Sequence, residues 1–166
     1  MSKLKLRLLV TALCSVIFSS CSAKEKVIGI GENIHHDDFE YSVQHLERVK
    51  EIGSLRARGT FFVAAFQVEN RAKRVDHQWS NNISYIIDEK GIEYGNEPEA
   101  QKELNRIKPF GYKPQYVTPA GAAEMTMLVF DVPDGVKEPF LKVRGFLLMG
   151  DVFDLNQYRR TRVKLF

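Results

Sequence analysis

The stretch Thr60–Asn70, with the sequence TFFVAAFQVEN, carries the strongest β-strand pattern of the chain. Its apolar residues form two alternating sets, which are Phe62, Ala64, Phe66 and Val68 on one face and Phe61, Val63 and Ala65 on the other. Successive side chains of a strand point to opposite faces of the sheet. A strand that is apolar on both faces is typical of the middle of a sheet. The stretch therefore predicts a central strand.

Other strand patterns lie on both sides of this stretch. Phe39–Val43 alternates apolar and polar residues, and the alternation shifts at His45-Leu46, where we expect a β-bulge. The basic segment Gly53–Gly59 is expected to be a loop. Ala123–Val132 predicts a long strand, and Pro133 ends it because proline has no N–H to donate to a sheet ladder.

The remaining patterns complete a mainly β chain. Asp88–Gly91 has the composition of a turn and predicts a hairpin between the strand that precedes it and the one around Ile92–Tyr94. Phe140–Met149 and Arg162–Phe166 predict the last two strands, and Glu97–Arg106 is the one convincing helix. Short strands separated by turns, with almost no helix, indicate an all-β antiparallel β-sandwich with one short helix in a connection.

The first 23 residues have the layout of a bacterial export signal that ends at a cysteine. Three basic residues, Lys3, Lys5 and Arg7, precede the apolar run Leu8–Phe18, and Ser19-Ser20-Cys21 follows. The run is about half as long as the roughly 20 residues that a membrane-spanning helix needs. It therefore predicts a cleaved signal rather than a membrane-spanning anchor.

Two cleavage sites compete. Ser19-Ser20-Cys21 resembles a lipobox, with Phe18 where leucine is usual, and implies cleavage before Cys21 with a lipid on that cysteine. The alternative is ordinary cleavage after Ala23. Cys14 and Cys21 are the only cysteines, and Cys14 is lost with the signal in both cases. Cleavage before Cys21 with lipidation modifies the remaining thiol, and cleavage after Ala23 removes it, so neither leaves a free thiol in an oxidising compartment. We expect the lipoprotein form, and resemblance to such proteins, with Ser22 after the cysteine, implies the outer membrane or cell surface.

The expected organisation is a signal peptide at 1–20, a short tether at 21–26 and a single domain at 27–166. Residues 1–20 hold three of the 24 basic residues and none of the 21 acidic ones, so the remaining chain is electrically balanced. A balanced chain has no net basic field, which argues against nucleic acid as a partner. The expected contacts are the membrane, through lipid at Cys21, and a protein partner in the envelope.

Three segments together resemble a family of bacterial lipoproteins and secreted proteins with a telokin-like, immunoglobulin-like sandwich. They are Phe39–Val43, the run from Gly59-Thr60-Phe61-Phe62-Val63 to Val68-Glu69-Asn70, and the run from Thr118-Pro119-Ala120-Gly121 to Val129–Pro133. The resemblance covers roughly Gly31–Phe166. It implies an immunoglobulin-like fold and brings no catalytic residues. The segment Gly95–Lys113 is longer and more charged than this family's pattern.

Candidate ligand residues are few. His35-His36-Asp37-Asp38 offers nitrogen and oxygen ligands, but neighbouring residues of an extended chain point to opposite sides, so at most two could bind one ion. We expect a solvated turn here, and no metal or other cofactor. Trp79, Phe110, Tyr112 and Tyr116 are expected in loops, where aromatic side chains either form a binding surface or plug the rim of the sandwich.

No catalytic motif is present in the sequence. Gly29-Ile30-Gly31 lacks the third glycine of a dinucleotide fingerprint, and no serine has a nucleophile elbow around it. We therefore expect a non-enzymatic, lipid-anchored binding module of the envelope. The alternative is a small-ligand or metal-binding module that uses His35 and His36, or the loops that carry Trp79 and Tyr112.

Overall fold

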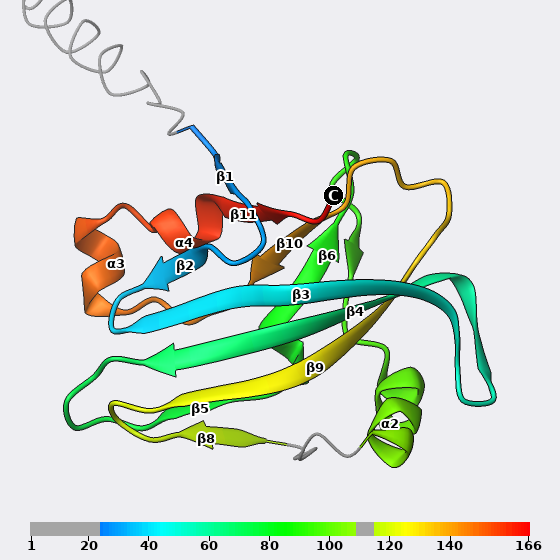
Figure 1. The fold of residues 1–166 in the computed structure, drawn as a ribbon. Helices are drawn as coiled ribbons and strands as arrows, with labels where there is room; N and C mark the ends of the chain where they lie inside the picture. Colours follow the sequence, from blue (N-terminus) through cyan, green and yellow to red (C-terminus); the bar gives the residue numbers. More distant parts are fainter. Residues whose placement is uncertain (1–23, 109–114) are drawn as a thin grey trace, which may run out of the picture.

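The computed structural model describes residues 24–108 and 115–166 (Figure 1). The predicted signal peptide, Cys21 and Tyr112 lie outside these ranges. The strands are β1 (Lys26–Ile28), β2 (Asn33–His36), β3 (Phe39–Ile52), β4 (Leu55–Asn70), β5 (His77–Trp79), β6 (Ser84–Ile87), β7 (Glu93–Tyr94), β8 (Tyr116–Thr118), β9 (Ala123–Val132), β10 (Phe140–Val143) and β11 (Thr161–Lys164). The helices are the 3-10 helix η1 (Asn81–Ile83) and the α-helices α2 (Pro98–Ile107), α3 (Met149–Phe153) and α4 (Gln157–Arg160).

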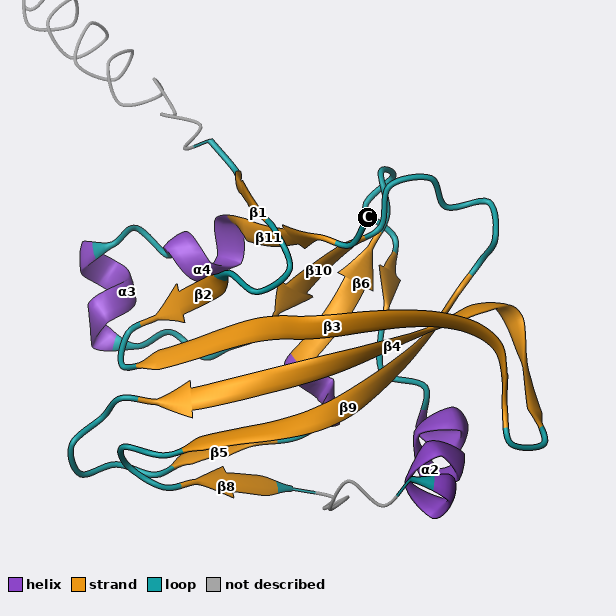
Figure 2. Cartoon of the chain, in the orientation of Figure 1, coloured by secondary structure: helices purple, strands orange, loops and turns teal. Residues whose placement is uncertain are grey.

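The strands form a β-sandwich, as the sequence predicts (Figure 2). One sheet has the order β2-β3-β4-β9, the other β1-β11-β10-β6-β7, and β5 pairs with β8 in a small third sheet. The described strands pair antiparallel except β1 and β11, which run parallel. The main core fills the space between the sheets, where Phe66 and Phe130 of one sheet and Leu141 of the other are fully buried.

The prediction of a central strand at Thr60–Asn70 is confirmed. β4 lies between β3 and β9, and its two apolar sets face two different clusters. Phe62, Phe66 and Val68 belong to the core between the sheets. Phe61 and Val63 pack instead with Ala100 and Leu104 of α2, which covers the other face of the same strand.

The predicted bulge and the predicted β6–β7 turn are also confirmed, and Asn70 fixes a further turn. The β3–β4 register shifts between Val43 and His45, which is the expected bulge. Asp88 closes the β6–β7 turn by accepting the N–H groups of Lys90 and Ile92, both at 2.8 Å. Asn70 ends β4, and its side-chain amide donates to the carbonyls of Val75 and Thr118.

Three sequence predictions about elements are wrong. Gly53–Gly59 is not a loop, because β3 and β4 extend to Ile52 and Leu55 and leave only a tight turn with Gly53 at φ 57°. The strand expected at Phe140–Met149 ends at Val143, and Met149 begins α3. The sequence predicted one helix, but the described residues form η1, α3 and α4 in addition to α2.

The sequence did not predict α3 and α4 because each is too short to show a helical repeat of apolar residues. Helices this short are stabilised by tertiary contacts rather than by helix propensity. Among residues 24–108 and 115–166, no helix has both the length and the apolar character needed to cross a bilayer.

Candidate functional site

A cavity of about 390 Å³ opens at one end of the sandwich, and we call it the aromatic pocket. Its walls come from β2, β3, β5, η1 and the segment after β10. The lining residues are His36, Phe39, Tyr41, His77, Gln78, Trp79, Ser80, Asn82, Ile83, Arg144, Gly145, Phe146 and Leu148. The volume lies within the range of small-molecule sites, roughly 300–1,000 Å³.

Stacked rings make the walls of the pocket rigid. The ring of His77 stacks on Phe39 with a centroid distance of 3.9 Å. Trp79 stacks on Tyr116 at 4.1 Å, and its indole N–H donates to the hydroxyl of Thr118 at 2.8 Å. Because each ring is held by a second ring or a hydrogen bond, the pocket is formed before any ligand binds.

A chain of four polar side chains runs behind the pocket: Asp151, His36, Tyr41 and His77. His36 Nε2 lies 3.0 Å from Asp151 Oδ2, and His36 Nδ1 lies 3.2 Å from the hydroxyl of Tyr41. The same hydroxyl lies 3.0 Å from Nε2 of His77. His36, Tyr41 and Asp151 are almost completely buried.

The neighbours of His36 fix which of its nitrogens carries hydrogen. Nε2 faces two acceptors, Asp151 Oδ2 and the carbonyl of Phe146, each at 3.0 Å, so it must donate. In neutral His36, Nδ1 then accepts the Tyr41 O–H, and the Tyr41 oxygen accepts Nε2–H of His77. Each of these three side chains thus has a partner whose role matches its own.

Burial shifts the pKa values of two of these side chains, His77 and Tyr41. Burial lowers the pKa of His77 to about 4, and the charge of His36 acts in the same direction. Burial also raises the pKa of the Tyr41 hydroxyl, with Tyr158 and Asp151 adding to the shift. His77 is therefore neutral near neutral pH and presents an uncharged ring to the pocket.

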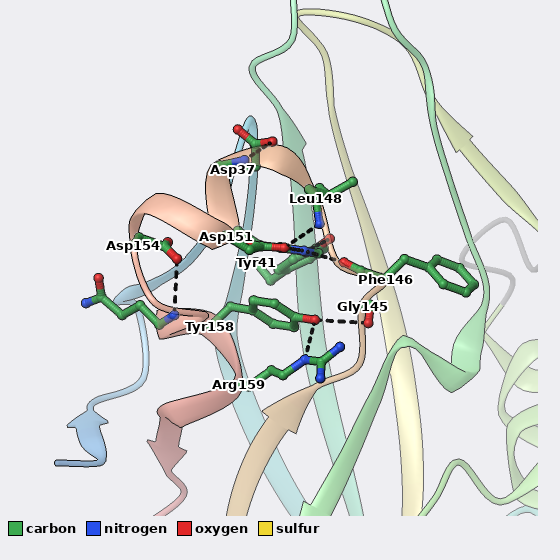
Figure 3. Close-up of polar contacts among 12 residues, drawn as sticks. Asp37, Tyr41, Gly145, Phe146, Leu148, Asp151, Asp154, Tyr158 and Arg159 are labelled. Carbon is green, nitrogen blue, oxygen red and sulfur yellow. Dashed lines mark hydrogen bonds and ion pairs between the residues drawn. The ribbon is translucent and has the colours of Figure 1, made fainter. Parts of the chain in front are cut away.

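Asp151 also holds the C-terminal segment in place. Its Oδ2 accepts the N–H of Leu148 at 2.7 Å, which caps the first turn of α3 (Figure 3). The ring of Tyr158 stacks on His36 at 3.8 Å, and its hydroxyl donates to the carbonyl of Gly145 at 3.0 Å. We call His36, Asp151 and Tyr158 the buried clasp, because they fix residues 145–160 to β2.

The structure brings together two of the sequence-predicted site residues. His36 and Trp79 both line the aromatic pocket, whereas the exposed side chain of His35 points away from it and lies 3.5 Å from Glu40. The expectation of a solvated turn at His35–Asp38 is wrong for His36, which is buried in β2. Trp79 and Tyr116 do not lie in loops but in β5 and β8, and both are buried. Phe110 and Tyr112 lie outside the described residues.

Sequence reasoning missed Tyr41, His77, Tyr158 and Asp151 as parts of the site. Asp151 is 115 positions from His36, and neither residue has a local motif that points to the other. Within residues 24–108 and 115–166, no group of three or more His, Cys, Asp or Glu side chains is arranged to hold a metal ion.

The geometry suits binding of an apolar or aromatic group. The polar side chains behind the pocket hydrogen-bond to one another. Arg144 at the wall pairs with Glu93 at 2.8 Å and lies over the ring of Tyr85. The surface left for a ligand is therefore chiefly aromatic and aliphatic, with the edges of His77 and Gln78 as polar neighbours.

No model of a known protein family matches this sequence, and no curated protein sequence matches it. Solved structures do show a similar fold. The yjhA protein of Bacillus subtilis has 14% identity and a TM-score of 0.57, and the match covers 85% of this chain and 99% of that one. MPT63, a secreted protein of Mycobacterium tuberculosis, has 13% identity and a TM-score of 0.51 over 76% of this chain and 94% of its own.

An uncharacterised β-sandwich protein of Clostridium difficile is also similar, with 14% identity and a TM-score of 0.50 over 86% of this chain and 95% of that protein. Identities this low establish likeness of fold and nothing finer. The fold expected from the sequence is confirmed: the described chain is a β-sandwich.

Proposed function

We propose that this chain is an exported, lipid-anchored envelope protein whose sandwich acts as a non-catalytic binding module, with the aromatic pocket as its binding site. The preformed pocket is the observation that carries the binding role. The signal-like first 23 residues support export. The secreted MPT63, as a neighbour in fold, is consistent with that location.

The ligand proposed for the pocket is an apolar or aromatic group presented by a partner protein in the envelope. The stacked pairs Phe39–His77 and Trp79–Tyr116 offer flat faces, and a flat ring placed against them would gain both burial and stacking. Aromatic anchors in desolvated pockets commonly dominate the affinity of protein interfaces.

A photoreactive amino acid tests the partner directly. Placed at Gln78, an exposed residue of the pocket wall, it should give one discrete protein adduct in intact cells. The matched control is Ile92, which is 51% exposed in the β6–β7 turn and lies outside the pocket lining. Equal adducts from both positions, or none from Gln78, would refute a protein partner at the pocket.

A free small ligand is the second candidate, favoured by the volume of the pocket, which lies in the range of small-molecule sites. Trp79 is the single tryptophan, so its emission reports on occupancy. Anilinonaphthalene sulfonate should bind with energy transfer from Trp79, and Asn82→Phe, which adds bulk at the pocket wall, should weaken this. Val117→Phe, on β8 and outside the lining, is the control. Transfer that is unaffected by Asn82→Phe would exclude the pocket.

The anchor is tested separately with an alkyne analogue of palmitate. We expect label on the wild-type protein and none on Cys21→Ser. Equal labelling of both, or no labelling of the wild type, would reject the lipid anchor and leave the soluble secreted form.

A further inference from the structure

An unusual set of exposed apolar side chains lies between β10 and β11, and we call it the apolar edge. Its members, with their exposed fractions, are Phe146 91%, Leu147 59%, Met149 77%, Val152 56%, Phe153 83% and Leu155 70%. Soluble proteins seldom expose large apolar side chains in one cluster unless the cluster contacts a partner or a membrane.

The fold holds these side chains outward. Met149, Val152 and Phe153 are spaced i, i+3 and i+4 along α3, so they share one face of that helix. Asp151 points the other way, into the buried clasp with His36. The N–H of Gly150 also donates to Asp37 at 3.2 Å, which fixes α3 against the β2–β3 turn (Figure 3).

The apolar edge lies at the end of the molecule where the N-terminal chain joins the domain. Lys26 of β1 pairs with Thr161, the residue that follows α4, and Glu25 bonds to Arg162 at 2.9 Å. Figure 1 shows β1, α4 and α3 at this same end, with α3 outermost. Only Ser22 and Ala23 separate Cys21 from Lys24, so the Cα atoms of Cys21 and Lys24 are at most about 11 Å apart even when the chain is extended.

Cationic side chains accompany the apolar ones. Lys24, Lys26 and Arg159 are exposed near the point where β1 meets α4 and β11. Three carboxylates lie in or beside α3, and each has a hydrogen-bond partner: Asp151 with His36 and Leu148, Asp37 with Gly150, and Asp154 with the N–H of Gln157. Aromatic and aliphatic side chains on one helical face, with Lys and Arg beside them, are the features of helices that lie in a membrane interface.

We infer that the apolar edge inserts into the interfacial layer of an anionic lipid surface, so that the sandwich is docked on the membrane rather than suspended above it. The inference rests on the proposed anchor for its location, but the contact itself is a property of the folded domain. A lipid surface fits better than a protein groove because the N-terminal chain, which would carry the lipid, joins the domain at this same end and the exposed Lys24 and Lys26 lie there (Figure 2).

Vesicle binding by the chain from Ser22 onward tests the inference without any lipid on the protein. This chain keeps every described strand and helix and both apolar clusters. It should float with vesicles of phosphatidylethanolamine and phosphatidylglycerol. The Met149→Ser/Phe153→Ser double variant should lose affinity by tenfold or more, since two large apolar contacts outside the pocket lining are removed. Val75→Ser/Met125→Ser, which removes two residues exposed elsewhere by 62% and 57%, should not lose affinity.

A tryptophan probe reports insertion itself. In Phe153→Trp, emission corrected for the buried Trp79 should shift to the blue with these vesicles and be quenched by brominated acyl chains. Met125→Trp should do neither. The inference is overturned if Phe153→Trp is unchanged, if both variants respond alike, or if sedimentation shows that the apolar edge forms a dimer which the double serine variant abolishes. Palmitate labelling of Cys21 is independent of all three outcomes.

Discussion

At the residue scale, Tyr41 is the link that makes the polar chain behind the pocket complete. Its single hydroxyl lies within hydrogen-bond distance of both Nδ1 of His36 and Nε2 of His77, and the side chain is almost completely buried. A buried polar group without a partner costs free energy, so each member of the chain depends on the next.

Replacing Tyr41 by phenylalanine should lower the free energy of unfolding by about 1–3 kcal/mol, because Nδ1 of buried His36 loses its partner. Urea denaturation followed by Trp79 fluorescence measures it. Tyr94→Phe is the control, since Tyr94 is only half-buried and Asp88, the partner of its hydroxyl, keeps two backbone N–H donors, and it should cost less. Equal losses in the two variants would contradict this account.

The lowered pKa of His77 predicts a pH dependence of stability. An unfolded histidine binds its proton near pH 6.5, whereas folded His77 binds it only near pH 4. The unfolded chain therefore holds more protons on this residue between these values, and the stability that neutral His77 contributes is lost as the pH falls from about 6.5 to 4. The full shift equals about 3 kcal/mol, and solvent screening of this partly buried ring reduces it to about 1–2 kcal/mol.

The measurement is the loss of unfolding free energy between about pH 7 and about pH 4.5. His77→Gln should lose about 1–2 kcal/mol less than the wild type over this interval. His45→Gln, at a largely exposed side chain, should behave like the wild type. A His77→Gln profile parallel to that of the wild type would refute a depressed pKa.

At the element scale, α2 explains why Thr60–Asn70 is apolar on the face that does not contact the second sheet. The strand is apolar on both faces because one face meets the second sheet and the other meets α2. The helix is short and polar, and its buried residues Ala100, Gln101 and Leu104 lie on one side. Gln101 bonds to the backbone of Met127 and Val129, which fixes the helix on β9.

Leu104→Ala should lower the free energy of unfolding by about 2–5 kcal/mol, because it opens a cavity between α2 and β4. Ile107→Ala, on the same helix but 45% exposed, should cost well under half as much. Thermal unfolding of the two variants provides the comparison. If Ile107→Ala were the more harmful change, the assignment of the buried face of α2 would be wrong.

At the scale of the whole molecule, the buried clasp connects the two ends of the chain. His36 comes from the second strand and Asp151 and Tyr158 from the last two helices, so the clasp forms only when the sandwich has closed. It also supports the wall of the aromatic pocket and the apolar edge, which ties both proposed contacts to one set of buried interactions.

Asp151→Asn should loosen residues 145–160 while the sheets remain folded. The charged carboxylate that accepts from His36 and Leu148 is replaced by a neutral amide, and the loss of a hydrogen bond to a charged group commonly costs about 1.5–3 kcal/mol. Hydrogen exchange should show lost protection in α3 and α4 and retained protection in β4. Asp154→Asn, whose carboxylate is only partly buried, should leave α3 protected. If protection of α3 and α4 were unchanged in Asp151→Asn, the buried clasp would not be what holds residues 145–160 in place.

The sequence by itself determined the sandwich, because strand alternation, turn residues and the doubly apolar Thr60–Asn70 are local properties that a chain cannot satisfy in another way. It also indicated His36 and Trp79 as candidate binding residues, but it placed them in an exposed turn and a loop, whereas both are buried in strands. Only the tertiary structure decided the pocket, the clasp and the apolar edge. The pocket and the clasp join residues more than a hundred positions apart. The apolar edge depends on the short helix α3, which is stabilised by packing and buried hydrogen bonds that leave no periodic trace in the sequence.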